Sequence, residues 1–182
     1  MVLSRDQCQI RCKSSSLLDL EVLSFTNCQL SGPLDDSLEK LQSLSVISLA
    51  LNNLSARVPD FFAHFKNLTV IKLGSCNLIG TFPEKVLQPQ SLQILDLSAN
   101  KNLSGMIHKD IFQDIQNLIS VDLGVNDFDG RIPSSLFSLQ KVQQIQLSNN
   151  NFACVLDNFM NPSLSLLDTL DLSCNKLEGE MP

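Results

Sequence analysis

Three aspartates, Asp96, Asp122 and Asp171, are the residues of this sequence best suited to a chemical role. Each stands alone between two aliphatic residues. Such carboxylates could act as general bases, ligate a metal or attract a basic ligand. The sequence offers little for the first two roles, because His64 and His108 are isolated and no Cys/His spacing of a metal site occurs. We therefore predict no catalysis, no cofactor and no metal. Two interpretations of the aspartates stay open: a site that attracts a basic peptide, and an ordinary solvated surface.

The elements that position these aspartates belong to a repeated pattern. Residues 118–133 place apolar residues first, then an asparagine, then a glycine, and end on Ile132 and Pro133. The pattern starts again every 24 to 26 residues, at Leu20, Leu44, Leu68, Leu92, Leu118, Val142 and Leu167. A leucine-rich pattern with a fixed period is the signature of a solenoid, whose repeats bury their apolar faces only by stacking.

Within a repeat, the alternation of apolar and polar residues, as in Leu95-Asp96-Leu97, predicts a short strand with one buried face. Seven such strands would stack as a parallel sheet about 30 Å long. An amide side chain follows the strand and could satisfy the backbone of the turn, at Asn52, Asn100, Asn126, Asn150 and Asn175. Proline then opens a return segment with apolar residues at helical spacing, as after Pro59 and Pro133.

These observations predict an α/β repeat fold. We expect a leucine-rich-repeat solenoid with a curved parallel β-sheet on the concave face and short helices or turns on the convex face. Residues 1–19 are predicted to form an imperfect N-terminal cap or a degenerate repeat. Residues 20–182 are predicted to form about seven repeats, of which the last is truncated.

The outward strand positions are the default binding surface of such a fold, because the core does not need their side chains. We predict that a ligand contacts the central outward column, which consists of Ser24, Ser48, Lys72, Asp96, Asp122, Gln146 and Asp171. The chain has no Trp or Tyr, so this column lacks the aromatic anchors that commonly dominate binding.

Three sequons would accept glycans in an exported chain, at Asn53, Asn67 and Asn102. Chance is the alternative explanation, because the repeat pattern itself generates Asn-x-Leu-Ser strings. The six cysteines do not fix the compartment: Cys8 and Cys12 are the only pair close in sequence, and they could bridge or remain thiols.

Composition excludes some classes of partner. Hydrophobic residues make up 43% of the 182 residues, enough for a continuous core. The net charge of -6 argues against a phosphate-binding surface, so we do not expect nucleic acid as a partner. The N-terminus reaches charged residues too early for a signal peptide, and no apolar stretch is long enough to span a membrane.

The repeat pattern resembles the plant-specific class of extracellular leucine-rich repeats over residues 20–182. The segments that match best are residues 30–49, 67–83 and 170–182, and they look like the ectodomain of receptor-like proteins of the Verticillium wilt resistance type. That resemblance implies a protein or peptide ligand, a co-receptor kinase as partner of the full-length relative, and a role in defence signalling at the extracellular side of the plasma membrane. The usual caps, signal peptide and membrane span of that family are missing, so we expect a fragment or a truncated relative.

A second hypothesis is a stand-alone secreted interaction protein. Polygalacturonase inhibitors share this repeat type, and a chain similar to them would bind another protein without a membrane anchor. Both hypotheses place recognition on the outward strand positions, and neither involves catalysis.

Overall fold

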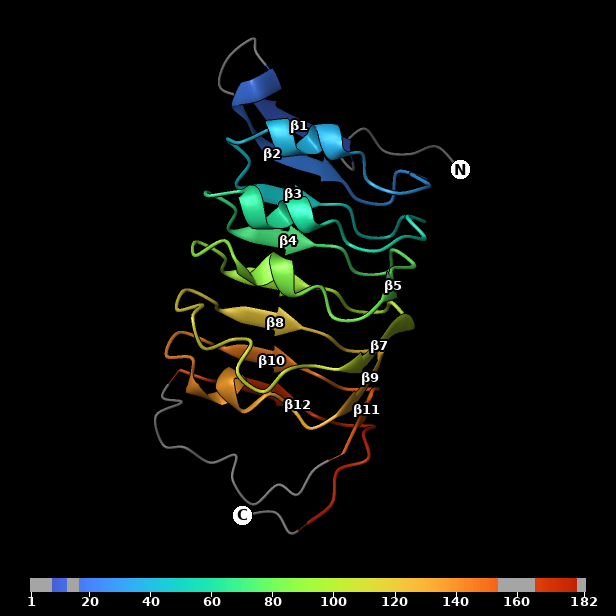
Figure 1. Ribbon diagram of the computed structural model, residues 1–182, viewed down its shortest axis with the longest axis vertical. Coiled ribbons are helices and arrows are strands. Elements are labelled where there is room, and N and C mark those ends of the chain that lie inside the picture. The colour runs from blue at the N-terminus through green and yellow to red at the C-terminus, as the bar shows by residue number, and fades with distance from the viewer. Residues whose placement is uncertain (1–7, 13–16, 154–165, 180–182) are drawn as a thin grey trace.

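The computed structural model describes residues 8–12, 17–153 and 166–179, and within them the chain forms a stack of short strands (Figure 1). The principal sheet follows the order β1-β2-β3-β4-β6-β8-β10-β12. Its strands are β1 (Cys8–Cys12), β2 (Leu20–Phe25), β3 (Val46–Ser48), β4 (Val70–Lys72), β6 (Ile94–Asp96), β8 (Ser120–Asp122), β10 (Gln144–Gln146) and β12 (Thr169–Asp171). All pairs from β2 to β12 are parallel, and β1 pairs antiparallel with β2.

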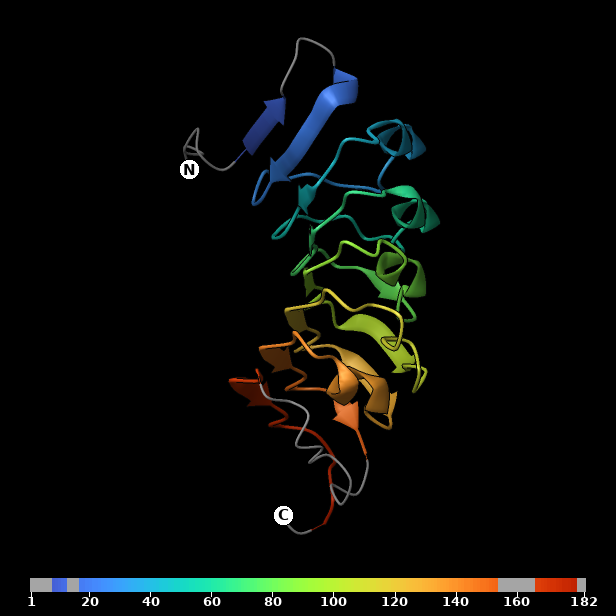
Figure 2. The same ribbon diagram turned by 90° about the vertical axis from the view of Figure 1, so that its left-hand side faces the viewer.

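The chain also forms short 3-10 helices, namely η1 (Leu17–Asp19), which directly precedes β2, and η2 (Asp36–Lys40), η3 (Asp60–His64), η4 (Glu84–Leu87) and η5 (Ser134–Ser138). Helices η2 to η5 lie on the side of the stack opposite the principal sheet (Figure 2). The last three begin directly after Pro59, Pro83 and Pro133, where the fixed φ of proline suits the first turn. The predicted solenoid, with strands on one face and short helices on the other, is therefore confirmed. The boundary between cap and repeats at residue 19 stays a prediction.

A second, smaller sheet was not predicted. It has the order β11-β9-β7-β5, with strands β5 (Ile79–Gly80), β7 (Asn102–Met106), β9 (Asp127–Gly130) and β11 (Asn151–Phe152). These strands lie beside the turns that follow β4, β6, β8 and β10 (Figure 1). They carry no clear period-two pattern, because their pairing comes from the stacking of adjacent turns.

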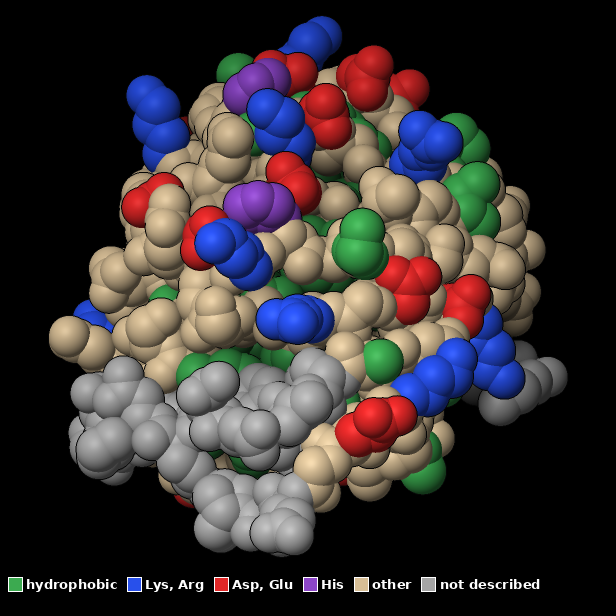
Figure 3. Space-filling view, turned by 60° about the horizontal axis from the view of Figure 1, so that its bottom comes forward, with side chains coloured by type: hydrophobic (Ala, Val, Ile, Leu, Met, Phe, Trp, Pro, Cys, Tyr) green, Lys and Arg blue, Asp and Glu red, His purple; other side chains and the backbone are tan. Residues whose placement is uncertain are grey.

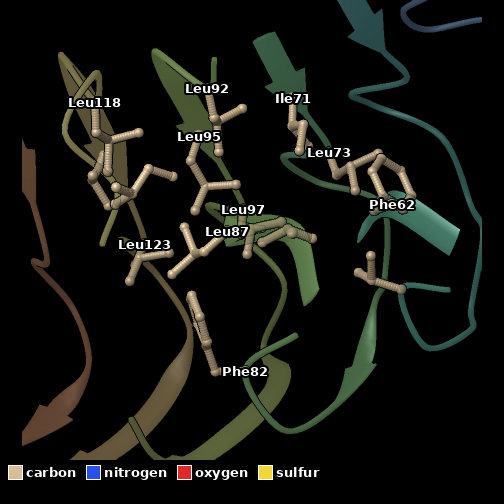
Figure 4. Close-up of a cluster of buried hydrophobic side chains, with 14 of the residues drawn as sticks. Phe62, Ile71, Leu73, Phe82, Leu87, Leu92, Leu95, Leu97, Leu118 and Leu123 are labelled. Atoms are coloured by element: carbon tan, nitrogen blue, oxygen red, sulfur yellow. The ribbon is translucent and has the colours of Figure 1, made fainter. Parts of the chain in front are cut away.

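The core is a continuous column of aliphatic side chains between the principal sheet and the helices (Figure 4). The first skeleton residue of six repeats is at most 2% exposed: Leu20, Leu44, Leu68, Leu92, Leu118 and Val142. Phenylalanines fill the helix side, where Phe61, Phe62 and Phe65 pack against one another with ring centroids 5.4–6.1 Å apart. Each large apolar side chain buried in this way contributes roughly 2 kcal/mol of transfer free energy.

Asparagines form a largely buried ladder in the turns after β3, β6, β8, β10 and β12. The side-chain Oδ1 of Asn100 accepts hydrogen bonds from the backbone N–H groups of Cys76 and Leu78, both at 2.9 Å. Its Nδ2 donates to the carbonyls of Leu73 and Leu97 at 3.0 and 2.9 Å. Similar links are made by Asn52, Asn126, Asn150 and Asn175. The structural role predicted for this position is confirmed.

Cysteine replaces the ladder asparagine in two repeats. Cys76 is fully buried, and its thiol donates to the carbonyl of Leu49 at 3.1 Å. Burial raises the pKa of the Cys76 thiol, so it keeps the proton that makes it a donor. Cys28 is disulfide-bonded, whereas Cys76 and Cys174 are free thiols.

Candidate functional site

The seven outward residues predicted to contact a ligand lie in one cross-strand row. Ser24 is in register with Ser48, Ser48 with Lys72, and Lys72 with Asp96. The row continues from Asp96 through Asp122 and Gln146 to Asp171. Lys72 is exposed and the other six are partly buried by their neighbours. The structure therefore brings together every residue of the predicted column, which we call the central row. Ligand binding by the row stays a prediction.

A second row runs beside the central row at the first position of each strand. Its first four members are aliphatic and in register, namely Val22, Val46, Val70 and Ile94. Its last three members are polar, namely Ser120, Gln144 and Thr169. We call the four aliphatic residues the aliphatic stripe. The outer surface of the sheet therefore changes character between β6 and β8.

The three aspartates of the central row are held in the same way. Asp96 Oδ1 accepts from the backbone N–H and the hydroxyl of Ser98, at 3.0 and 2.7 Å. Asp122 Oδ1 accepts from the N–H of Gly124 at 2.9 Å, and Asp171 repeats the first arrangement with Ser173. Each carboxylate is thus oriented by the backbone two residues later.

Glycine beside two of these carboxylates leaves them room. A Cβ added at Gly74 would lie 2.9 Å from Asp96 Oδ1, and one added at Gly124 would lie 3.2 Å from Asp122 Oδ1. A side chain at either position would push the neighbouring carboxylate out of its orientation.

The central row carries three carboxylates and one ammonium group, that of Lys72. Burial raises the pKa of Asp122, the N–H of Gly124 partly opposes this, and the negative charges of Asp96 and Asp171 raise the pKa further. Hydrogen bonds from Ser173 hold the pKa of Asp171 below its usual value. Among the described residues, no ion pair involves any of the three aspartates. The side of the molecule seen in Figure 3 differs, because basic, acidic and histidine side chains are interspersed there.

A shallow hollow lies where the surface changes character. Its volume is about 360 Å³, and it spans β4 to β10. The residues of the two rows that line it are Lys72, Ile94, Asp96, Ser120, Asp122, Gln144 and Gln146. The end of the aliphatic stripe and the start of the aspartates therefore share one depression.

The histidines are not part of a site. His64 Nδ1 lies 2.8 Å from the carboxylate of Glu39 on the surface, and His108 Nδ1 accepts from the N–H of Asp110 at 3.4 Å. In the part of the chain that the structure describes, no group of three or more His, Cys, Asp or Glu residues is placed to hold a metal. The absence of catalysis remains a prediction from the sequence.

The three sequon asparagines, Asn53, Asn67 and Asn102, are exposed, and none of them is part of either outward row. The hydroxyl of Ser55 donates to Asn53 Oδ1 at 2.7 Å, and Asn102 is the first residue of β7 in the smaller sheet. Glycans at these positions remain a prediction.

A second hollow, about 470 Å³ in volume, borders the smaller sheet and was missed from the sequence. Ile79 and Met106, 40% and 76% exposed, are the large apolar lining residues most open to solvent. Both residues adjoin a glycine with positive φ, Gly80 and Gly105, which is the sequence signal that could have marked them.

Comparisons with known proteins identify what this geometry resembles. A family model described as Leucine Rich Repeat matches residues 19–41, and no curated protein matches the chain. Among solved structures, the Arabidopsis receptor kinase HAESA, in complex with the peptide hormone IDA and the co-receptor SERK1, is 28% identical with a TM-score of 0.82. The match covers 91% of this chain and 27% of that chain.

Two further structures define how far the likeness extends. The plant peptide hormone receptor RGFR1, in complex with RGF2, is 29% identical with a TM-score of 0.77, covering 84% of this chain and 24% of that chain. A plant ice-binding protein is 24% identical with a TM-score of 0.72, covering 88% of this chain and 59% of that chain, and shows the fold alone. The chain thus resembles about a quarter of the length of these plant receptor ectodomains.

In the described residues every helix is a short 3-10 turn, and none has the length and hydropathy needed to cross a bilayer.

Proposed function

We propose that this chain is a ligand-recognition module of a plant cell-surface receptor-like protein, and that it binds a peptide or protein on the face formed by the central row. The proposal includes a role in defence signalling outside the plasma membrane, which the resemblance to receptor-like proteins of the Verticillium wilt resistance type supports. A co-receptor kinase would be the second partner of the full-length protein.

The observation that carries the proposal is the row itself. Seven side chains that the core does not require are aligned in register across seven strands, beside a hollow of about 360 Å³. The similar receptors HAESA and RGFR1 were solved with peptide hormones, which supports a peptide ligand here. Because these receptors are only 28% and 29% identical to this chain, its ligand has to be inferred from its own residues.

A glycan placed on the row tests the proposal. Gln146→Asn puts an acceptor asparagine two residues before Ser148, in the middle of the candidate face. The matched control is Asp35→Asn, two residues before Ser37 on the helix side. Asp35 caps η2 by accepting from the N–H of Ser37 at 2.8 Å, and asparagine preserves that cap.

Both variants and the unmodified chain would be secreted from plant cells, immobilised, and used to select a phage library of random linear 12-residue peptides. Glycan occupancy would be measured by mass spectrometry. We expect the unmodified chain and the Asp35→Asn control to enrich the same peptides, and the glycosylated Gln146→Asn chain to enrich none of them. Equal enrichment by the glycosylated Gln146→Asn chain, or no enrichment by any chain, would refute the proposal.

A further inference from the structure

The outer surface of the principal sheet is divided along the length of the stack. From β2 to β6 the first row is aliphatic, and the central row over β2 and β3 has only the neutral hydroxyls of Ser24 and Ser48. From β8 to β12 the first row is polar, and from β6 to β12 three of the four central positions are aspartates. A partner that matched both parts would itself be divided into an apolar segment and a basic segment.

The aliphatic stripe is a suitable surface for an apolar segment. Val22, Val46, Val70 and Ile94 are each only partly buried, although they stand on the solvent side of the sheet. Three strand spacings separate Val22 from Ile94, which is about 14 Å. An extended peptide advances about 3.3 Å per residue, so a run of about four apolar residues spans the stripe, with alternate side chains pointing toward it.

The position of a basic residue follows from the charges. Lys72 disfavours a cation over β4, whereas Asp122 has Asp96 on the adjacent strand and Asp171 two strands away. Asp122 is partly buried, and none of its described neighbours forms an ion pair with it. A guanidinium or ammonium group there would offset the repulsion among the three carboxylates.

The hollow connects the two parts. Ile94 and Asp122 both line it, and their strands β6 and β8 are adjacent in the sheet. Ile94 is in register with Ser120, so Asp122 lies one strand across and two residues along, about 8 Å from Ile94, which an extended chain crosses in two to three residues. The backbone of Gly124 already holds Asp122 Oδ1, so little ordering of this carboxylate would accompany binding.

We propose that the ligand is a linear peptide in which a run of about four apolar residues has Arg or Lys within three residues of one of its ends, with the apolar run on the aliphatic stripe and the basic residue at Asp122. This inference rests on the proposed function and adds the chemical class and placement of the ligand. The spacing is defined by side chains, so the peptide backbone can run in either direction along the stack.

The test uses the peptides that the complete chain selects from the random 12-residue phage library. We expect the enriched sequences to contain the apolar run and a nearby Arg or Lys. Selection against Asp122→Lys should replace that basic residue by Asp or Glu at the same spacing. The matched control is Asp129→Lys, which reverses an exposed acidic residue on β9 of the smaller sheet and should leave the selected sequences unchanged.

Affinities measured by calorimetry with the most enriched synthetic peptide sharpen the result. Asp122→Asn should weaken binding about tenfold, the loss of one charge-assisted hydrogen bond, and Asp129→Asn should have no effect. Asp122→Asn can be studied in secreted protein, because it creates no glycosylation sequon: residue 124 is Gly and not Ser or Thr. Val70→Thr keeps the shape of the side chain but adds a hydroxyl to the stripe, and should weaken binding about threefold.

Thermal unfolding of each variant would verify its fold, and Asp122→Asn replaces Asp122→Lys if the charge reversal does not fold. Enriched peptides without the apolar and basic segments, or an unchanged preference of the Asp122 variants, would overturn this inference while leaving peptide recognition intact. No enrichment by the unmodified chain would overturn the proposed function as well.

Discussion

Two columns of polar side chains run the length of the stack, and their surroundings are opposite. The asparagine ladder lies inside the turns, where Asn52, Asn100, Asn126 and Asn150 are at most 8% exposed. The aspartates of the central row lie on the outer surface of the sheet and are partly exposed. Both columns recur with the same period, so recurrence alone does not separate a structural position from a binding position.

The difference appears in how completely each side chain is satisfied. The amide of Asn100 uses both its oxygen and its nitrogen on backbone groups of two repeats, so its removal leaves several buried groups without partners. Asp96 uses Oδ1 on Ser98 alone, within its own repeat. The ladder therefore holds the repeats together, whereas the aspartates can be altered without loss of the stack.

The largest expected effect is the loss of one ladder amide. Asn100→Ala should lower the free energy of unfolding by about 3–4 kcal/mol, because the buried N–H groups of Cys76 and Leu78 and the carbonyl of Leu73 lose a partner. Asp96→Ala in the same repeat should cost less than about 1 kcal/mol, since its contacts are local and partly exposed. Urea denaturation of the unglycosylated chain measures both. Equal losses would contradict the distinction between the columns.

The next effect comes from the residue that precedes each ladder amide. This position has positive φ in every described repeat, and Val125 occupies it at φ 58°. A β-branched residue is strained in the left-handed region, whereas asparagine tolerates it. Val125→Asn should therefore raise the free energy of unfolding by about 1 kcal/mol.

The reverse change is the matched control for that prediction. Asn149 holds the equivalent position at φ 56°, so Asn149→Val should lower the free energy of unfolding by about 1 kcal/mol. The same urea experiment measures both variants. A stabilising effect of Asn149→Val would show that backbone strain at this position is unimportant.

Much of this architecture was predictable, because two periods in the sequence determine it. The 24-residue period sets which strands are neighbours, and the two-residue period sets which face each side chain takes. Together they placed all seven residues of the central row, from Ser24 to Asp171. The glycine that follows the asparagine in the repeat pattern has positive φ at Gly32, Gly80, Gly105, Gly130 and Gly179.

Other features depend on interactions that no single repeat encodes. The smaller sheet forms because turns of adjacent repeats pair, so strands as short as Ile79–Gly80 have no signal of their own. The hollow depends on which side chains happen to be neighbours across β4 to β10. The positive φ at Leu51 and Val125 was also hidden, because neither residue type prefers that conformation.

The smallest expected effect is a difference between Asp122 and Asp171 in how each makes the stability of the chain depend on pH. The pKa of Asp122 is raised, chiefly by burial, so its ionisation costs more in the folded chain than in the unfolded chain. Its contribution to stability is present below the unfolded pKa, near 3.8, and is lost as pH rises through the folded pKa. Asp122→Asn should therefore make the chain more stable at pH 7 relative to pH 3 than the unmodified chain is.

Asp171 should have the opposite sign. Hydrogen bonds from Ser173 lower its pKa, so its contribution is present above the unfolded pKa and is lost as pH falls through the folded pKa. Asp171→Asn should thus reduce stability at pH 7 and have little effect at pH 3. Unglycosylated protein is required, because this substitution creates an acceptor two residues before Ser173. Urea denaturation at pH 3 and pH 7 measures how each substitution changes the pH dependence of the free energy of unfolding. If both substitutions change it in the same direction, burial and repulsion at Asp122 do not outweigh the hydrogen bond from Gly124.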